Sequence, residues 1–150
     1  MDTQQVEITG RSLLVSIFVS ENIEVAEPVR DHGIDLIIHS NLSIRRFSAV
    51  PIQLKAAQKE TFSVSKKYLK FPDLYMAYVW NVTEPQRASI YIMLHSVAVE
   101  IATRHGYTNS RSWSEKGGYS VNTRIPKALS TSLEPYKYTP GNLHKLISAL

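Results

Sequence analysis

Two neighbouring strand-like segments constrain the fold of this chain more than any other feature of its sequence. Residues 33–38 (Gly-Ile-Asp-Leu-Ile-Ile) and 50–56 (Val-Pro-Ile-Gln-Leu-Lys-Ala) are short, rich in β-branched and apolar residues, and bounded by turn-forming or polar residues. Successive side chains of a strand point to opposite faces, so Gln53 and Lys55 share one face of the second segment. If the two strands are antiparallel neighbours, Asp35, Gln53 and Lys55 converge at one end of a sheet.

The remaining hydrophobic pattern predicts a mixed α/β layer structure. A helix is expected over residues 3–20, although Gly10 weakens it locally. Strands are expected over residues 23–29, 34–39, 47–57, 61–64, 74–82 and 89–94, with one helical turn over 65–70. A helix over 95–105, a loop-like region over 106–124 that has room for a strand at 119–122, and a final helix ending at 150 follow. Pro51 indicates that its strand is an edge strand, carries a bulge or begins there.

Length and composition indicate one globular domain over residues 1–150. The chain is 43% apolar and 20% charged, which suits a packed core. It has no cysteine, so disulfides and thiolate metal sites are excluded, and its five histidines show no metal-ligand spacing. No apolar run approaches the roughly 18 residues of a membrane span, and the polar N-terminus does not resemble a signal peptide. We expect a cytoplasmic protein that does not contact a membrane.

Charge is distributed unevenly along the chain. Residues 1–35 hold seven acids and two bases, whereas residues 36–150 hold fifteen bases and six acids. Such a basic region beside an acidic cluster predicts a polyanionic partner, namely nucleic acid and most simply DNA, although a solvated basic surface is the plainer alternative. The basic residues expected to contact nucleic acid are Arg45, Arg46, Lys59, Lys66 and Lys67.

The converging polar residues have the chemistry that phosphodiester hydrolysis needs. Mg²⁺ prefers oxygen ligands, commonly one or two carboxylates. Asp35 supplies one, and Glu7 on the first helix is expected to reach the same end of the sheet, although it also has Arg11 four residues away as an ion-pair partner. Lys55 can orient a water and offset the developing negative charge, and Gln53 can orient ligands. Glu24 and Glu27 are rival carboxylates.

The segments Asp31–Leu36 and Ile52–Ala56 resemble the PD-(D/E)xK, or restriction endonuclease-like, superfamily. They are most similar to its Gln-x-Lys branch, which includes Mrr-type nucleases, and their layout is similar to that of archaeal-type Holliday junction resolvases. The resemblance covers roughly residues 5–95. It implies a restriction endonuclease-like core, in which a central mixed β-sheet is flanked by helices, with Mg²⁺ or Mn²⁺ as cofactor and Asp35, Gln53, Lys55 and Glu7 as catalytic residues.

Gln53 stands where most of that superfamily has an acid, so the expected metal site has one negative charge fewer. Two alternatives to a nuclease therefore stay open. One is a nucleic-acid-binding module with a degraded site, and the other is a protein-interaction module whose oppositely charged halves meet a partner. Cleavage of two strands would favour a homodimer.

Overall fold

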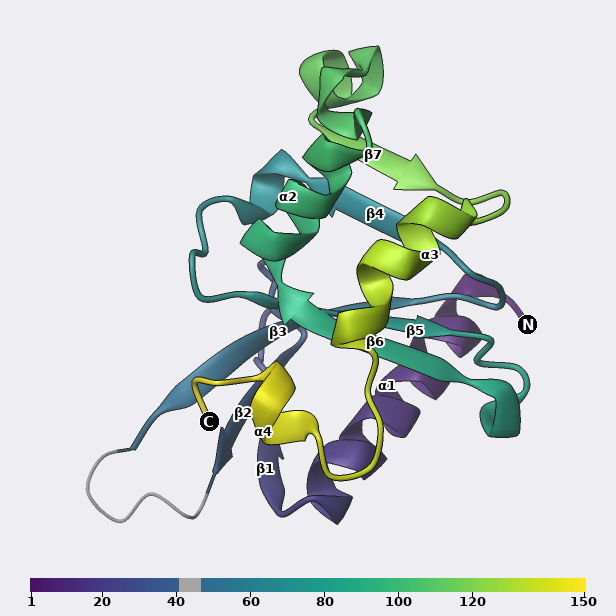
Figure 1. The fold of residues 1–150 in the computed structure, drawn as a ribbon. Coiled ribbons are helices and arrows are strands. Elements are labelled where there is room, and N and C mark those ends of the chain that lie inside the picture. The colour runs from purple at the N-terminus through teal and green to yellow at the C-terminus, as the bar shows by residue number, and fades with distance from the viewer. Residues whose placement is uncertain (41–46) are drawn as a thin grey trace.

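The computed structural model describes residues 1–40 and 47–150, which form helices and strands arranged around one central sheet (Figure 1). The helices are α1 (Thr3–Ser20), α2 (His95–Arg104), α3 (Lys127–Leu133) and α4 (Leu143–Leu146), with a 3₁₀ turn, η1, at Lys66–Tyr68. The strands are β1 (Ile23–Ala26), β2 (Leu36–Ser40), β3 (Ala49–Ala56), β4 (Phe62–Ser65), β5 (Tyr75–Trp80), β6 (Ser89–Leu94) and β7 (Gly118–Val121). The expectation of a mixed α/β fold is confirmed.

The central sheet has five strands in the order β1-β2-β3-β5-β6, and β4 pairs with β7 in a separate two-stranded sheet. β2 and β3 are antiparallel neighbours, with Leu36 opposite Ile52, so the condition for Asp35, Gln53 and Lys55 to converge is met. β3 and β5 are parallel, which makes the sheet mixed. Of the three possibilities that Pro51 indicated, an edge strand is excluded because β3 lies between β2 and β5, and the strand begins two residues earlier, at Ala49. Pro51 is tolerated because pairing with β5 begins one residue later, at Ile52, so Pro51 has a neighbouring strand on one side only.

Helix α1 covers one face of the central sheet. Its N-terminus is fixed by a capping box, in which the Asp2 side chain accepts from the Gln5 N–H while the Gln5 side chain accepts from the Asp2 N–H. Every fourth residue from Val6 to Phe18 is buried, so a single stripe of the helix faces the sheet. Residues from α4 complete this core against β2, β3, β5 and β6. This packing holds the first turns of α1 beside the C-terminal end of β3.

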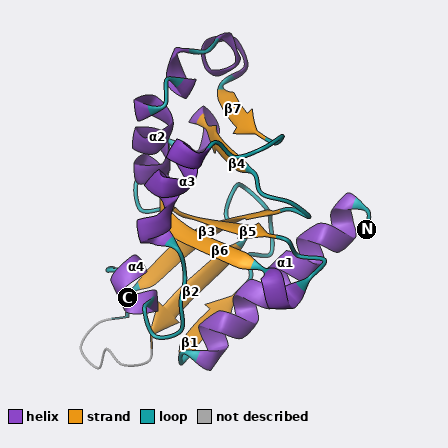
Figure 2. Ribbon diagram, turned by 45° about the vertical axis from the view of Figure 1, so that its right-hand side comes forward, coloured by secondary structure: helices purple, strands orange, loops and turns teal. Residues whose placement is uncertain are grey.

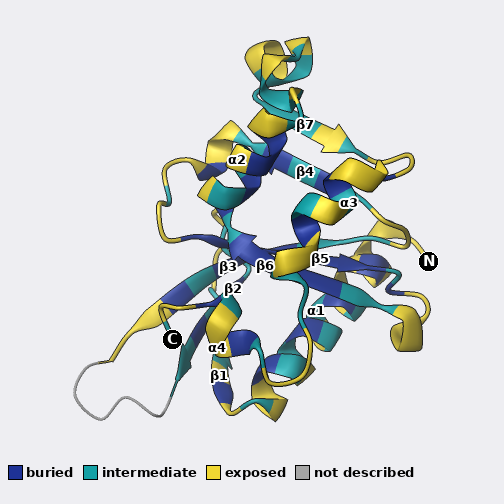
Figure 3. Ribbon diagram, in the orientation of Figure 1, coloured by how far each residue is buried: buried dark blue, intermediate teal, exposed yellow. Residues whose placement is uncertain are grey.

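A second core lies on the opposite face, where β4, η1, α2 and α3 pack against β5 and β6 (Figures 2 and 3). A parallel strand pair needs a crossover that leaves the sheet and returns to it. Here the crossover from β3 to β5 contains β4 and η1. Tyr75, Tyr78 and Trp80 on β5 are all buried, which confirms that this aromatic run belongs to the core rather than to an exposed stacking surface.

The C-terminal third departs most from expectation. Residues 106–124 contain a 3₁₀ turn (Tyr107–Asn109) and a π-helix (Ser112–Lys116) before β7, and α3 has no counterpart among the predicted elements. Helix α3 buries only Leu129 and Leu133, so its hydrophobic pattern is too short to stand out. The final helix spans only Leu143–Leu146. Within the described ranges, no helix is both long and apolar enough to cross a membrane.

Candidate functional site

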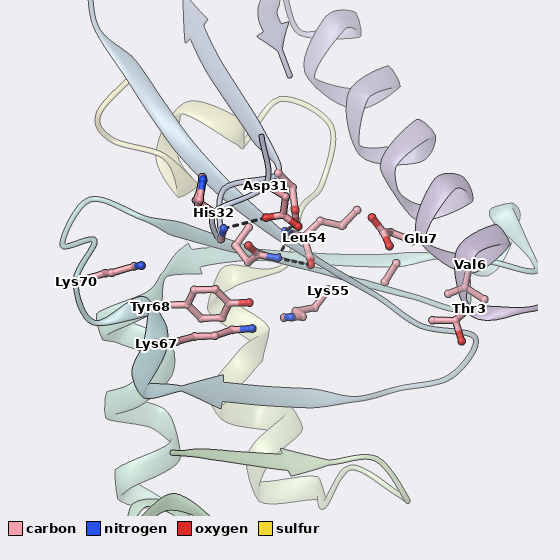
Figure 4. A pocket seen from close by; sticks show the side chains of 14 residues that line it. Thr3, Val6, Glu7, Asp31, His32, Leu54, Lys55, Lys67, Tyr68 and Lys70 are labelled. Atoms are coloured by element: carbon pink, nitrogen blue, oxygen red, sulfur yellow. Dashed lines mark hydrogen bonds between the residues drawn. The ribbon is translucent and has the colours of Figure 1, made fainter. Parts of the chain in front are cut away.

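A cavity of about 590 Å³ opens between the first turns of α1, the turn before β2, the middle of β3 and η1 (Figure 4). Glu7, Asp35, Gln53 and Lys55 all line it, so the structure brings the four residues predicted to be catalytic to one place. The other lining residues are Thr3, Val6, Asp31, His32, Gly33, Leu54, Ala56, Lys67, Tyr68 and Lys70.

The turn before β2 places Asp35 at the cavity. The Gly33 N–H donates to Asp31 Oδ1 at 2.9 Å, and Gly33 has a φ of +92°, a conformation that other residues adopt only with strain. The Asp35 N–H then donates to the Ile52 carbonyl at 2.9 Å. Asp35 therefore enters the sheet already tied to β3, one residue before β2 begins.

The Asp35 carboxylate is held by two donors from β3. Its Oδ2 atom accepts from the Leu54 N–H at 2.7 Å and from Gln53 Nε2 at 2.6 Å. Burial raises the pKa of Asp35 above its ordinary value, and the Leu54 N–H opposes that rise because it stabilises the ionised form. Asp31 raises the pKa further, while Arg11 and Lys55 lower it. The raised pKa of Asp35 thus reflects a carboxylate that is partly withdrawn from water.

Gln53 is the most buried polar residue of the site, with an exposed fraction of 7%. Besides Asp35, its Nε2 group donates to the Leu54 carbonyl at 3.2 Å. Its Oε1 atom is buried, and no described residue donates to it. A buried amide oxygen without a partner costs free energy, so this atom marks a place where a donor or a cation would be favourable.

Lys55 lies against the aromatic ring of Tyr68. Its Nζ is 5.5 Å from the ring centroid, and Lys67 Nζ is 5.0 Å from the same centroid. Tyr68 is only 2% exposed, and the ring of His95 meets it edge-on at 5.5 Å. Burial raises the pKa of the Tyr68 hydroxyl, so it stays protonated at neutral pH. Tyr68 thus forms a rigid wall that two ammonium groups share.

Glu7 reaches the cavity but is engaged elsewhere. Its Oε1 atom accepts from Arg11 Nη2 at 2.9 Å, and the side chain is 57% exposed. Arg11 also approaches Glu27 at 3.6 Å. Glu7 is therefore a surface residue paired with Arg11 at i+4 that also lines the cavity, and its role as a metal ligand stays a prediction.

The residues expected to contact nucleic acid are dispersed. Lys67 lines the site cavity, Lys66 Nζ lies 5.4 Å from the centroid of the Trp113 ring, and Lys59 lines another cavity near the N-terminus. Arg45 and Arg46 fall outside the described residues. The sequence argument missed Tyr68, Asp31 and Lys70 as site residues. Only the basic-aromatic run Lys66-Lys67-Tyr68 could have drawn attention to one of them.

Acidic and imidazole side chains alone do not form a metal site here. Within residues 1–40 and 47–150, no group of three or more histidine, aspartate or glutamate side chains is placed to hold a metal ion. A cation would have to draw on carbonyl and amide oxygens as well. Comparison with family models, with curated proteins and with solved structures finds no match to this chain.

Proposed function

We propose that the chain is a metal-dependent nuclease with a restriction endonuclease-like core, which hydrolyses phosphodiester bonds of nucleic acid, with DNA as the expected substrate. One observation carries the proposal. The Asp35 carboxylate, the Gln53 amide and the Leu54 carbonyl meet at one point of a cavity that Glu7 and Lys55 also line. Carboxylate, neutral oxygen donor and ammonium group are the three components that the resemblance to PD-(D/E)xK nucleases requires.

The donor atoms at this point fit a hard divalent cation. Mg²⁺ and Mn²⁺ take oxygen ligands, and Asp35 Oδ2 and the Leu54 carbonyl oxygen both lie within hydrogen-bond distance of Gln53 Nε2. The unpartnered Gln53 Oε1 would be the third oxygen ligand, after Asp35 Oδ2 and the Leu54 carbonyl. Rotation of the Gln53 amide would exchange the positions of Oε1 and Nε2 and so bring Oε1 beside the other two oxygens. Asp35 and Glu7 would hold the ion, with Glu7 released from Arg11.

The roles of the protein groups follow from their placement. A cation bound there would supply positive charge against the phosphate oxygens. Lys55, two residues beyond Gln53 on the same strand face, donates hydrogen bonds to the attacking water and offsets negative charge on the phosphate as the water adds. Tyr68 restricts the Lys55 ammonium by lying beneath it. Gln53 keeps the Asp35 carboxylate oriented toward the cavity.

A nucleic-acid-binding module without cleavage is the second candidate, and Gln53 is the observation that favours it. Its amide nitrogen already donates to Asp35 Oδ2, so the carboxylate has a hydrogen-bond partner within the protein itself. This function predicts binding that falls steeply with salt, needs no metal and survives the loss of the Asp35 charge.

The test is cleavage of supercoiled plasmid and of branched DNA with Mg²⁺ or Mn²⁺, comparing wild type with Asp35→Asn. Asp73→Asn is the matched control, because Asp73 is exposed and does not line the cavity. We expect cleavage by wild type and by Asp73→Asn, and a loss of at least about a hundredfold for Asp35→Asn. Equal cleavage by Asp35→Asn, or none by pure folded wild type, would refute the nuclease.

A further inference from the structure

A second cavity adjoins the site along the small two-stranded sheet. It has a volume of about 360 Å³ and is bounded by η1, β4 and β7. Lys55, Lys67 and Tyr68 line both cavities and so form a common wall. Figure 4 shows these three side chains between the group around Asp31 and Leu54 and the two pale strands below, which are β4 and β7. A ligand in one cavity would be in contact with the same side chains as a ligand in the other.

The two-stranded sheet turns its hydroxyl groups toward this cavity. Ser63 on β4 pairs with Ser120 on β7 in antiparallel register, so both point to the same side, and alternation places Ser65 there as well. Phe62 and Val64 point to the other side and are buried in the second core. The apolar face of the sheet thus anchors it, while the polar face is left to line a cavity.

The two cavities differ in charge. The site cavity contains the carboxylates of Glu7, Asp31 and Asp35. No acidic side chain is among the described residues that line the adjoining cavity, where the charged groups are Lys55 and Lys67. The other polar side chains of the lining are Ser63, Ser120 and Tyr68, together with Ser65 and Ser112, whose hydroxyls already donate to the Gly117 and Gly118 carbonyls. Ammonium and hydroxyl donors without a competing carboxylate are the groups that bind phosphate oxygens.

Local contacts hold the basic side of this cavity in place. Ser65 Oγ accepts from the Lys67 N–H at 3.4 Å and donates to the Gly117 carbonyl at 3.4 Å. It therefore joins η1 to the turn before β7. The Lys67 ammonium in turn lies over the Tyr68 ring. A cation held against a buried ring loses less side-chain entropy on binding an anion than a freely solvated lysine does.

We propose that the adjoining cavity binds the phosphodiester backbone of a nucleic-acid strand. Ser63 and Ser120 donate hydrogen bonds to phosphate oxygens there, and Lys67 supplies the charge. The strand then continues past Lys55, which places the next phosphate at Asp35. This last step rests on the proposed nuclease function, whereas binding in the adjoining cavity does not require cleavage.

The first test introduces a carboxylate into the adjoining cavity by Ser120→Glu. Ser148→Glu is the control, because it makes the same charge change at an exposed position that lines neither cavity. Binding of a fluorescein-labelled single-stranded oligodeoxynucleotide is measured by anisotropy in EDTA, with circular dichroism to confirm the fold. We expect Ser120→Glu to bind about tenfold more weakly than wild type and Ser148→Glu to change binding by less than about twofold.

The second test measures the charge contact itself. Lys67→Gln should reduce the slope of log affinity against log salt concentration by about 1, whereas Lys145→Gln, at an exposed residue of α4, should leave the slope unchanged. Equal effects of Ser120→Glu and Ser148→Glu, an unchanged slope for Lys67→Gln, or no binding by wild type would each overturn the proposal. So would displacement of the oligonucleotide by inorganic phosphate at concentrations matching those of unlabelled oligonucleotide, because that result indicates a free-phosphate site.

The two proposals fail separately. Binding in EDTA that is weakened by Ser120→Glu supports the adjoining cavity even if wild type never cleaves DNA with Mg²⁺ or Mn²⁺. Cleavage that depends on Asp35 but is indifferent to Ser120→Glu keeps the nuclease and overturns the adjoining cavity.

Discussion

Gly10 sets the distance between α1 and the central sheet, and replacing it with alanine tests how the fold and the site are connected. Gly10 is buried in the middle of α1. A Cβ atom placed on it would clash with the Cβ of Ala56 on β3 and would lie 3.5 Å from Val82 Cγ1. Ala56 has no rotamer to change, and its strand is paired with β5 at Val79. The clash can therefore be relieved only by moving the helix.

Two opposing effects decide the sign of Gly10→Ala. Alanine in a helix interior is favoured over glycine by about 1 kcal/mol. Overpacking a well-packed core costs about 1–3 kcal/mol, and a clash with a side chain that has no freedom belongs in the upper half of that range. We expect a net loss of about 1–2 kcal/mol in the free energy of unfolding, or a decrease of about 4 °C in Tm for a chain of this size. Helix propensity alone predicts the opposite sign.

Urea unfolding followed by tryptophan fluorescence measures this difference in stability. The decisive control is a double variant in which residues 10 and 56 exchange alanine and glycine. The double variant Gly10→Ala with Ala56→Gly moves the methyl from the sheet to the helix, so its loss of stability should be smaller than the sum of the two single losses by at least about 1 kcal/mol. Ser16→Ala, on the exposed side of α1, should change stability by less than about 0.5 kcal/mol. A Gly10→Ala variant as stable as wild type, or additive single effects, would refute the packing argument.

Two further predictions concern the charges at the site. Asp35→Asn should be at least as stable as wild type at pH 7, because burial raises the pKa of Asp35 and an amide oxygen can accept from both Leu54 N–H and Gln53 Nε2. Because the pKa of Asp35 is raised in the folded state, its contribution to the stability of the wild type is present at low pH and is lost as pH rises through the folded-state pKa. The stability advantage of Asp35→Asn should therefore shrink as pH falls toward 3.8, the ordinary pKa of an aspartate. Urea unfolding at a series of pH values measures this difference. Gln53→Glu should cost about 3 kcal/mol at pH 7 in EDTA, because a donor at 2.6 Å from Asp35 becomes a like charge, with Gln86→Glu as the exposed control. Stability of Gln53→Glu that does not rise on acidification would contradict this explanation.

The parts of the fold that the sequence predicted well are those governed by local periodicity. The helix over residues 3–20 and the strand over 89–94 have the predicted bounds, because each carries an uninterrupted pattern ended by polar or turn residues. Alternation of side chains placed Gln53 and Lys55 on one face of their strand, whereas the antiparallel pairing of β2 with β3 was only a condition of that argument, which the structure meets. That pairing alone was sufficient to bring Asp35 to Gln53.

The parts that the sequence did not predict depend on contacts between distant segments. Tyr68 lines the site because the crossover between β3 and β5, which contains η1, folds back toward β3. Nothing in the local sequence of residues 66–70 indicates that this segment would lie beside β3. The central position of Pro51 depends on where β5 begins its pairing, more than twenty residues later. The common wall between the two cavities has the same origin, since the residues of β7 pair with residues of β4 that lie 53 to 59 positions earlier in the chain.

Gln53 explains how one site supports both candidate functions. A carboxylate at this position would repel the Asp35 carboxylate at close range, and Arg11 and Lys55 would offset that repulsion only in part, so a cation or a shared proton would be favoured there. The amide instead donates to Asp35, which replaces that repulsion with a hydrogen bond. With an amide at position 53 the oxygen donors carry one negative charge fewer than with a carboxylate, so a divalent cation would bind more weakly. Nucleic acid should therefore bind at cation concentrations that are too low for cleavage. Gln53→Glu should lower the cation concentration at which cleavage begins. If cleavage by wild type and by Gln53→Glu has the same cation dependence, the amide oxygen and its neighbours are not the ligands.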